Sequence, residues 1–325
     1  MNALEIIKQF GIEITLTDSI ILLLGLILFG IWLLKTSLGR KALASSVPRR
    51  NNMPVYLPFI PLFIWWGAFG IAISITAKLL PDLPDWQSAF LDNLILCICA
   101  IAAMTVIICL ARTHFARRLK GFGLNAKTIH KDFLAGVLNL LSVWPLLILM
   151  IVLTTSVGKL IWGQEFEMQQ HQELELITAH PQLPVRVLII VTTVAVVPVF
   201  EEMLFRGLFQ TMIRSFLGTR RSSLGARGTG HKERVTDRNR AFPVRSESQS
   251  QAGPTSARTS NGAWLAIVIN SGLFATAHYE PGHWPALFVL SVCLGYSYEK
   301  SGSLFRPIFI HSLFNATSVI AALYQ

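Results

Sequence analysis

Two adjacent carboxylates and an arginine lie inside an otherwise apolar stretch, residues 197–207. They are Glu201, Glu202 and Arg206, and the side chains around them are apolar enough for a membrane interior. An ionisable side chain at the middle of a bilayer costs at least ~2.5–3.5 kcal/mol, so such groups are rarely kept there without a function. This stretch is therefore the leading candidate for a functional site.

The spacing of these residues gives the two glutamates different roles. Glu202 and Arg206 are four residues apart, so on a helix they share a face and can form an ion pair. Glu201 is rotated by roughly 100° from Glu202, so it is free to face a cavity while the arginine holds Glu202. If Pro198 is the first residue of a restarted helix, both glutamates also lie near a helix N-terminus, where negative charge is favoured.

Three further polar side chains lie in later apolar segments. His278 ends one segment, and His311 and Asn315 lie one helical turn apart in another, so both face one direction. This set suits hydrolysis of an amide bond, because Glu or His can take a proton from water while His and Asn donate to a developing oxyanion. Glu201, His278 and His311 could instead hold a zinc ion, with water as its fourth ligand. A purely structural role, bracing helices by hydrogen bonds, is the third interpretation.

The composition indicates an integral membrane protein. Of the 325 residues 52% are hydrophobic and 14% are charged, whereas a soluble domain usually carries about 25% charged residues. The net charge of +10 is not accompanied by any nucleic-acid-binding module, so no nucleic acid partner is expected. Cys97, Cys99, Cys109 and Cys293 all lie in apolar runs, where a free cysteine behaves as a small hydrophobic residue.

We expect an all-α membrane protein of about eight transmembrane helices in one bundle, with a polar cavity formed by the late helices. Only helices or closed barrels satisfy backbone groups in lipid, and these apolar runs are too long for barrel strands. The predicted spans are residues 20–34, 53–77, 90–110, 133–157, 185–216, 263–279, 284–298 and 304–323. Residues 1–160 hold the first four helices, and residues 185–323 hold the helices with the polar set.

The loops between these spans differ in charge. Basic loops follow spans one, three and five, with Arg306 after span seven, and acidic or neutral loops follow spans two, four and six. By the positive-inside rule the basic side is cytoplasmic, so both termini are expected to face outward. Residues 218–262 are polar, with nine Lys or Arg against three acids, and we predict that they form a disordered basic insertion.

The polar residues carry a resemblance to a known family. Glu201-Glu202-x-x-x-Arg206, Phe274-x-x-x-His278 and His311-x-x-x-Asn315, in this order on separate late spans, resemble the three motifs of the CPBP family. That family comprises the type II CAAX prenyl endopeptidases and the bacteriocin-processing or immunity proteins, also called Abi. The resemblance covers about residues 185–323 and implies an intramembrane endopeptidase with an eight-helix core that opens toward the cytoplasm.

Carried over by position, the resemblance assigns a role to each residue of the set. Glu201 and His278 would activate the water, His311 and Asn315 would stabilise the oxyanion, and Glu202 with Arg206 would shape the site. The cofactor stays open, because the family has been described both as metalloproteases, using zinc or another divalent metal, and as metal-independent enzymes. The insertion at 218–262 departs from the family pattern, in which that connection is usually short, and this bears on substrate access and regulation.

The expected partners are the lipid bilayer and a membrane-associated peptide or protein substrate. A bacterial plasma membrane is the expected location, and a prenylated C-terminus is normally absent from bacteria, so peptide processing or immunity is equally open. A non-enzymatic scaffold or bacteriocin self-immunity protein would bind a peptide in the same cavity. A transporter is disfavoured, because the ionisable residues are confined to the second half of the chain.

Overall fold

The structure of the protein is a computed structural model that describes residues 16–166, 168, 172–217 and 255–323. Within this part of the chain the secondary structure is helical, and strand geometry is limited to an isolated bridge between Asn51 and Phe115. The expectation of an all-α protein is therefore confirmed. The predicted insertion lies outside the described residues between positions 218 and 254.

The helices follow the predicted spans closely. In chain order they are α2 (Leu16–Lys35), α3 (Phe59–Leu79), α4 (Asp85–His114), α5 (Arg118–Phe122), η1 (Ala126–Thr128), α6 (Ile129–Trp162), α7 (Gln172–Ala179), α8 (Leu183–Val191), η2 (Thr192–Val196), α9 (Val197–Glu202), η3 (Met203–Gln210), α11 (Thr255–Thr276), η4 (Pro281–His283), α12 (Trp284–Ser301) and α13 (Phe305–Leu323). Two boundaries differ from the prediction by six residues or more, 59 against 53 and 255 against 263. α3 begins after Pro54 and Pro58, which disfavour helix in the residues before them, and α11 begins at Thr255 rather than at Ala263.

Five helical segments of the described chain are long and apolar enough to cross a membrane. They are Leu16–Lys35, Phe59–Leu79, Asp85–His114, Ala126–Trp162 and Leu183–Leu217. The helices α11, α12 and α13 are not among them, because they carry many of the buried polar side chains, including Asn270, Ser291 and His311. The protein is thus an all-α membrane protein, and the count of eight spans stays a prediction.

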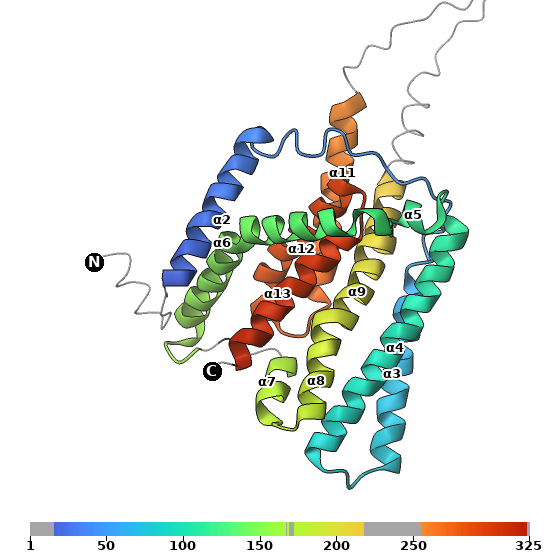
Figure 1. Ribbon diagram of the computed structural model, residues 1–325, viewed down its shortest axis with the longest axis vertical. Helices are drawn as coiled ribbons and strands as arrows, with labels where there is room; N and C mark the ends of the chain where they lie inside the picture. The colour runs from blue at the N-terminus through green and yellow to red at the C-terminus, as the bar shows by residue number, and fades with distance from the viewer. Residues whose placement is uncertain (1–15, 167, 169–171, 218–254, 324–325) are drawn as a thin grey trace, which may run out of the picture.

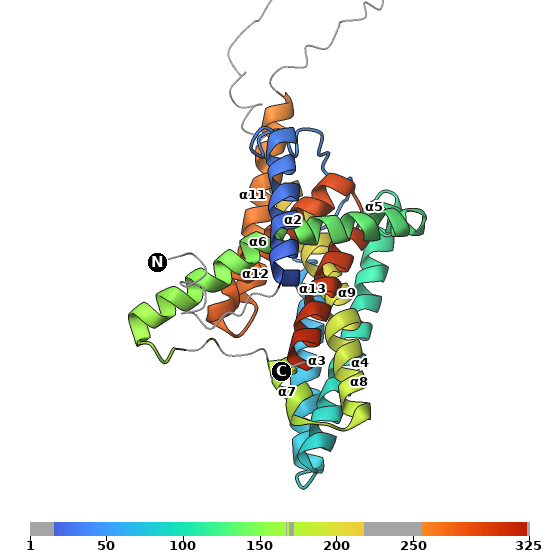
Figure 2. The ribbon, with the colours of Figure 1, turned by 60° about the vertical axis from the view of Figure 1, so that its left-hand side comes forward.

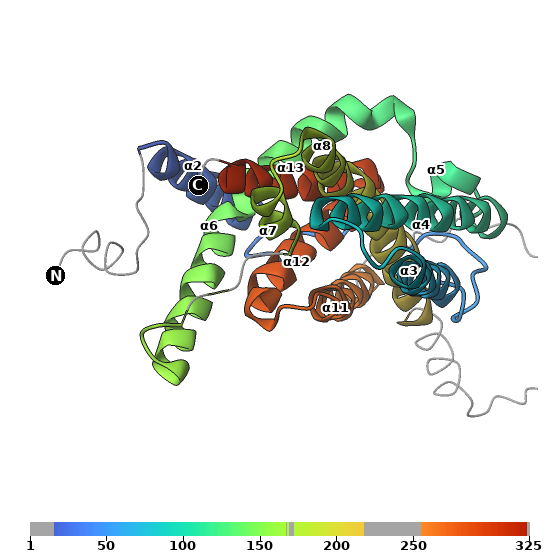
Figure 3. The ribbon, with the colours of Figure 1, turned by 90° about the horizontal axis from the view of Figure 1, so that it is seen from below.

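The helices are arranged in three groups across the molecule (Figure 1). α2 and the C-terminal part of α6 lie on one side, α3 and α4 lie on the other, and α9, α11, α12 and α13 lie between them, as the view from below also shows (Figure 3). α6 crosses the other helices obliquely (Figure 2). The helices that carry the predicted site residues therefore occupy the middle of the bundle.

α2 packs against α6 at a close backbone approach. A Cβ atom at Gly25 would lie 2.5 Å from the carbonyl oxygen of Leu141 and 2.8 Å from the ring of Pro145. Because Pro145 has no N–H, the Leu141 carbonyl lacks its usual partner within α6. Only glycine leaves room for this contact, and Gly25 is the buried residue of α2, so most of that helix surface faces outward.

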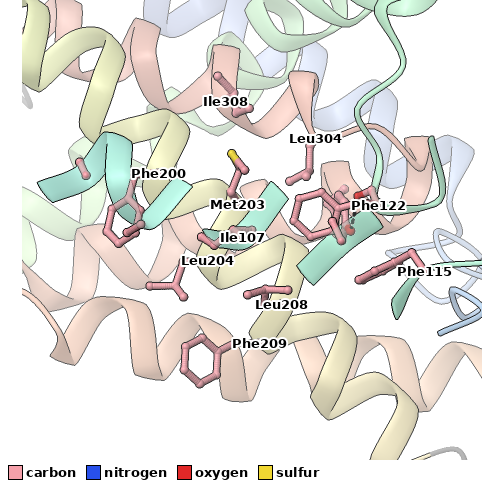
Figure 4. Packing of buried hydrophobic residues seen from close by; sticks show 14 residues of the cluster. Ile107, Phe115, Phe122, Phe200, Met203, Leu204, Leu208, Phe209, Leu304 and Ile308 are labelled. Carbon is pink, nitrogen blue, oxygen red and sulfur yellow. Dashed lines mark hydrogen bonds between the residues drawn. The ribbon is translucent and has the colours of Figure 1, made fainter. Parts of the chain in front are cut away.

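A hydrophobic cluster fixes the helix that carries the glutamates (Figure 4). Phe200, Met203, Leu204 and Leu208 are buried against Ile107 of α4 and further apolar residues. In lipid such packing, rather than exclusion of water, drives helix association. The backbone at Glu201 and Glu202 is therefore held by tightly packed neighbours on both sides.

Loops that are far apart in the sequence meet at one end of the bundle. Lys300 Nζ at the end of α12 donates to the carbonyl of Ala42, at 3.0 Å. Arg49 Nη1 donates to the carbonyl of Gly121 in α5, at 2.9 Å. The basic loops after α2 and α4 therefore lie together with the end of α12. The turn between α3 and α4 lies at the opposite end (Figure 1).

Candidate active site

The segment with the two glutamates is one uninterrupted helical run. Residues 183–217 pass through α8, the π-helical segment η2, α9 and the π-helical segment η3 without a break. Val196 and Val197 keep helical dihedral angles (φ −70°, ψ −52° and φ −64°, ψ −48°). The hypothesis that a helix restarts at Pro198 is therefore wrong, because Pro198 fits into the run through the π turn that precedes it. Glu201 has no helix N-terminus beside it.

Pro198 instead leaves the Thr193 carbonyl without a backbone donor, and Asn315 takes that place. In a π-helix the N–H of residue 198 would pair with the carbonyl of residue 193, and proline has no N–H. Asn315 Nδ2 donates to the Thr193 carbonyl at 2.9 Å in its place. This bond ties α13 to η2, and it leaves the second amide N–H of Asn315 available to another acceptor.

Glu202 and Arg206 form the ion pair that their spacing predicts. Arg206 Nε lies 3.1 Å from Glu202 Oε2, and both side chains are fully buried. The N–H bond is not aligned with that oxygen, so the contact is an ion pair without a hydrogen bond. Arg206 Nη2 donates to Ser291 Oγ at 2.7 Å, and its guanidinium carbon lies 4.5 Å from the centre of the Phe274 ring, a favourable cation–π distance.

His311 lies between the two glutamates. Its Nδ1 is 2.9 Å from Glu202 Oε1, and its Nε2 is 3.8 Å from Glu201 Oε2. An ionised carboxylate only accepts hydrogen bonds, so Nδ1 carries a proton toward Glu202. Nε2 can then donate only when both ring nitrogens carry a proton.

His278 also carries a proton on Nδ1. Its Nδ1 lies 2.8 Å from the carbonyl oxygen of Phe274, and a carbonyl can only accept, so Nδ1 carries the proton. In the neutral ring Nε2 therefore has a lone pair and can act as a base. Trp284 Nε1 donates to the His278 carbonyl at 2.9 Å, which fixes the chain where α11 ends.

Phe274 is the common neighbour of the charged and basic groups. The centre of its fully buried ring lies 4.9 Å from that of His278 and 5.7 Å from that of His311. Arg206 lies over the same ring. Phe274 thus sets the spacing of the two imidazoles and covers the arginine with apolar surface.

A cavity of about 150 Å³ joins four of the six predicted site residues. Glu201, His278, His311 and Asn315 all line it, and the side chain of Glu201 is 18% exposed. Glu202 and Arg206 do not line it and are buried behind His311. A larger cavity of about 590 Å³, between the end of α6 and η4, contains none of the six.

The walls of the smaller cavity extend beyond the late helices. Leu96 of α4 and Leu174 of α7 line it beside the polar residues. α7 is held at its C-terminal end, where Arg186 Nε donates to the carbonyl of His180 at 3.1 Å. The cavity has room for several water molecules, but it is smaller than the ~300–1,000 Å³ typical of ligand sites.

The three residues proposed as zinc ligands do not form a metal site as they stand. Among the described residues no three His, Cys, Asp or Glu side chains are grouped so that they could hold a metal ion. The bond from His311 Nδ1 to Glu202 is of the kind that orients a metal-binding imidazole, and it leaves Nε2 on the side of Glu201. The role of Glu201, His278 and His311 as zinc ligands therefore stays a prediction.

Sequence reasoning did not assign a role to three residues that shape the site. Ser291 contacts Arg206, and Thr193 contacts Asn315. A single serine or threonine in an apolar span gives no signal of such contacts. Leu174 was also missed, because the surrounding residues are polar and acidic and were interpreted as a loop. Phe274 was recognised as part of a motif, but its contacts with Arg206, His278 and His311 could not be predicted from the sequence.

The comparison with known families covers the segment that carries the candidate site. Residues 183–317 match the family described as type II CAAX prenyl endopeptidase, Rce1-like. No curated protein and no solved structure matches the chain. The match begins with α8 and ends within α13, so it contains all six predicted site residues. The resemblance of the three motifs to the CPBP family is therefore confirmed over residues 183–317, where the chain is similar to the Rce1-like type II CAAX prenyl endopeptidases.

Proposed function

We propose that the protein is an intramembrane endopeptidase that hydrolyses a peptide bond of a membrane-associated protein or peptide. The family of residues 183–317 supports a CAAX protease-type function in a membrane. The observation that carries the mechanism is the cavity in which Glu201, His278, His311 and Asn315 meet. These residues come from α9, from the turn that follows α11 and from α13, which are separated in sequence.

In the proposed reaction a water molecule in the cavity gives a proton to Glu201 or to His278 Nε2. Its oxygen attacks the carbonyl carbon of the scissile peptide bond. Both bases are suited to this step, because Glu201 is the exposed carboxylate of the pair and the tautomer of His278 leaves Nε2 unprotonated. The same base then returns the proton to the leaving amine as the C–N bond breaks.

The negative oxygen of the tetrahedral intermediate needs donors. The second N–H of Asn315 Nδ2 and the protonated Nε2 of His311 can supply them. Glu202 accepts the hydrogen bond of His311 Nδ1 and fixes the ring, and Arg206 compensates the charge of Glu202. Glu202 and Arg206 are thus positioning residues, since neither lines the cavity.

A cleavage assay tests this proposal. The full-length protein in proteoliposomes is given internally quenched peptides with and without a prenylated cysteine near the C-terminus. The wild type should cleave at least one of them, and Glu201→Gln and His278→Ala should lower the rate at least ~100-fold, as expected for a lost general base. Ser312→Ala, a half-buried neighbour of His311, is the matched control and should keep wild-type activity.

Two other outcomes distinguish the alternatives. Wild-type cleavage by both Glu201→Gln and His278→Ala would show that the mechanism is wrong. Binding of a peptide without cleavage, unchanged in both variants, would support a non-enzymatic scaffold or immunity protein. Metal analysis of the purified protein addresses the cofactor, because a stoichiometric ion that is lost in His278→Ala would support a metal-dependent mechanism.

A further inference from the structure

Six basic side chains are exposed around the connection between α4 and α6. They are Arg112, Arg117, Arg118, Lys120, Lys127 and Lys131. Residues 112–131 contain no Asp or Glu, so this basic surface has no acidic group of its own. Figure 1 places α5, the middle of the surface, at the end of the bundle where the basic loops meet.

The basic surface lies between two candidate membrane spans. One span ends at His114, and the next begins at Ala126. A short connection between two spans must lie where the bilayer meets water. The basic side chains are therefore at the depth of lipid headgroups.

Acidic side chains of neighbouring helices and loops do not neutralise the charge of this surface. None of the six side chains forms an ion pair with a residue that the structure describes. The acids that belong to this end of the bundle have other partners. Asp132 is buried and pairs with Arg306 at 3.2 Å, and Glu299 accepts a hydrogen bond from Ser46 Oγ at 2.7 Å.

The backbone beneath the basic surface is fixed. Tyr298 Oη donates to the carbonyl of Phe122 at 2.9 Å, and the N–H of Leu304 donates to the carbonyl of Gly123 at 2.9 Å. Above these bonds, Arg117, Arg118 and Lys120 line a hollow in the surface with Asn125. Because the backbone is already ordered, binding an anion here restricts little besides the side chains.

We propose that this basic surface binds the phosphate groups of anionic phospholipids in the adjoining leaflet. Arginine and lysine form charge-assisted hydrogen bonds with phosphate, and the side chains already stand at headgroup depth. Each basic residue near an anionic membrane contributes about fivefold to binding. Zwitterionic lipids carry no net charge and gain little of this attraction.

Lipid retention by the full-length protein tests the proposal. The protein in mild detergent is titrated with phosphatidylglycerol or phosphatidylcholine, and bound lipid is counted by native mass spectrometry. The test variant carries Arg112→Gln, Arg117→Gln and Lys120→Gln. Arg118 is kept, because its φ of +52° makes substitution there a risk to the backbone. The control variant carries Lys78→Gln, at an exposed position in the last turn of α3, at the opposite end of the bundle.

The wild type should bind phosphatidylglycerol more tightly than phosphatidylcholine. The test variant should lose at least about tenfold in affinity for phosphatidylglycerol, and the control variant less than about threefold. Thermal unfolding checks that both variants fold. If the test variant does not fold, Arg117→Gln and Lys120→Gln are measured singly, and the affinity of each for phosphatidylglycerol should fall a few-fold. Equal losses in test and control, or no loss, would overturn the proposal. Displacement of the lipid by an equal concentration of inorganic phosphate would also overturn it, since the ligand would then be free phosphate.

Discussion

Glu201 and Glu202 are adjacent in the sequence, and their surroundings differ in every respect. Glu202 is fully buried, with Arg206 on one carboxylate oxygen and His311 on the other. Glu201 is partly exposed to the cavity, and its Oε2 lies 3.8 Å from His311 Nε2. One carboxylate therefore holds the site together, and the other is available for chemistry.

The local part of this arrangement could be predicted from the sequence. The ion pair of Glu202 with Arg206 follows from their spacing on one helix, and the structure confirms it. The bond of Glu202 with His311 joins residues that are far apart in the sequence, and no periodicity predicts it. The tautomers of His278 and His311 depend on their partners, so they could be assigned only from the structure.

Asn315 has a predicted effect on both stability and rate. In Asn315→Asp the side chain can no longer donate to the Thr193 carbonyl, and a negative charge enters the cavity that holds Glu201. We expect a loss of about 1–3 kcal/mol in the free energy of unfolding and a fall of ~10²–10³ in the cleavage rate. Denaturant titration and the peptide assay measure the two effects. An unchanged rate would exclude Asn315 as an oxyanion donor.

At the scale of elements, the π-helical segments decide where the site residues point. η2 and η3 lie on either side of α9, which carries both glutamates. π-helical turns are rare and are often found at functional sites. The positions of the helices could be predicted from the apolar runs, whereas the π turns could not, because they result from packing around Pro198 and the bond from Asn315. α7 was missed for a related reason, since its few apolar residues are buried only by contacts with other helices.

Gly207 is predicted to be sensitive to a single added methyl group. A Cβ atom there would collide with the ring of Phe122, and Phe122 is fully buried. We expect Gly207→Ala to lower the free energy of unfolding by about 1–3 kcal/mol, as other overpacked cores do. Phe122→Leu in the same chain should recover part of this loss.

Gly272 provides the matched control for this substitution. It lies within α11, and nothing surrounds its Cβ position within 4 Å. Gly272→Ala should leave stability unchanged or raise it by up to about 1 kcal/mol, since alanine favours helix more than glycine. If Gly207→Ala proves as stable as Gly272→Ala, the contact of Phe122 with the helix that carries the glutamates is not as tight as described.

Leu174 is predicted to control access to the cavity. Leu174→Trp adds bulk to a wall that the four polar residues share, so we expect kcat/KM for peptide cleavage to fall roughly tenfold or more, a barrier increase of at least ~1.4 kcal/mol. Ala179→Trp, at an exposed position of the same helix, should have no such effect. Equal activities of the two variants would mean that α7 does not limit entry.

At the scale of the whole molecule, the contacts between loops give the bundle two distinct ends. The bonds from Lys300 and Arg49 bring the basic loops together, as their common charge predicted. The number of spans could not be derived in the same way. The late helices combine the length of a span with the polarity of a site, so hydropathy alone does not identify them.

The orientation of these two ends can be measured with single cysteines. Arg40→Cys and Lys120→Cys, in a chain whose exposed Cys109 is replaced by Ser, should both react with a membrane-impermeant thiol reagent added from the cytoplasmic side. Asp82→Cys, in the turn between α3 and α4, should react only from the other side, because basic loops stay in the cytoplasm. Labelling of positions 40 and 120 from opposite sides would contradict the arrangement of the loops.

The separation of roles between Glu201 and Glu202 is tested most directly by comparing two isosteric variants for both stability and cleavage. Glu201→Gln should unfold within about 0.5 kcal/mol of the wild type and cleave at least ~100-fold more slowly. Glu202→Gln should lose about 3–5 kcal/mol, because it leaves the buried Arg206 without its partner. Wild-type cleavage by Glu201→Gln, or wild-type stability of Glu202→Gln, would contradict this assignment.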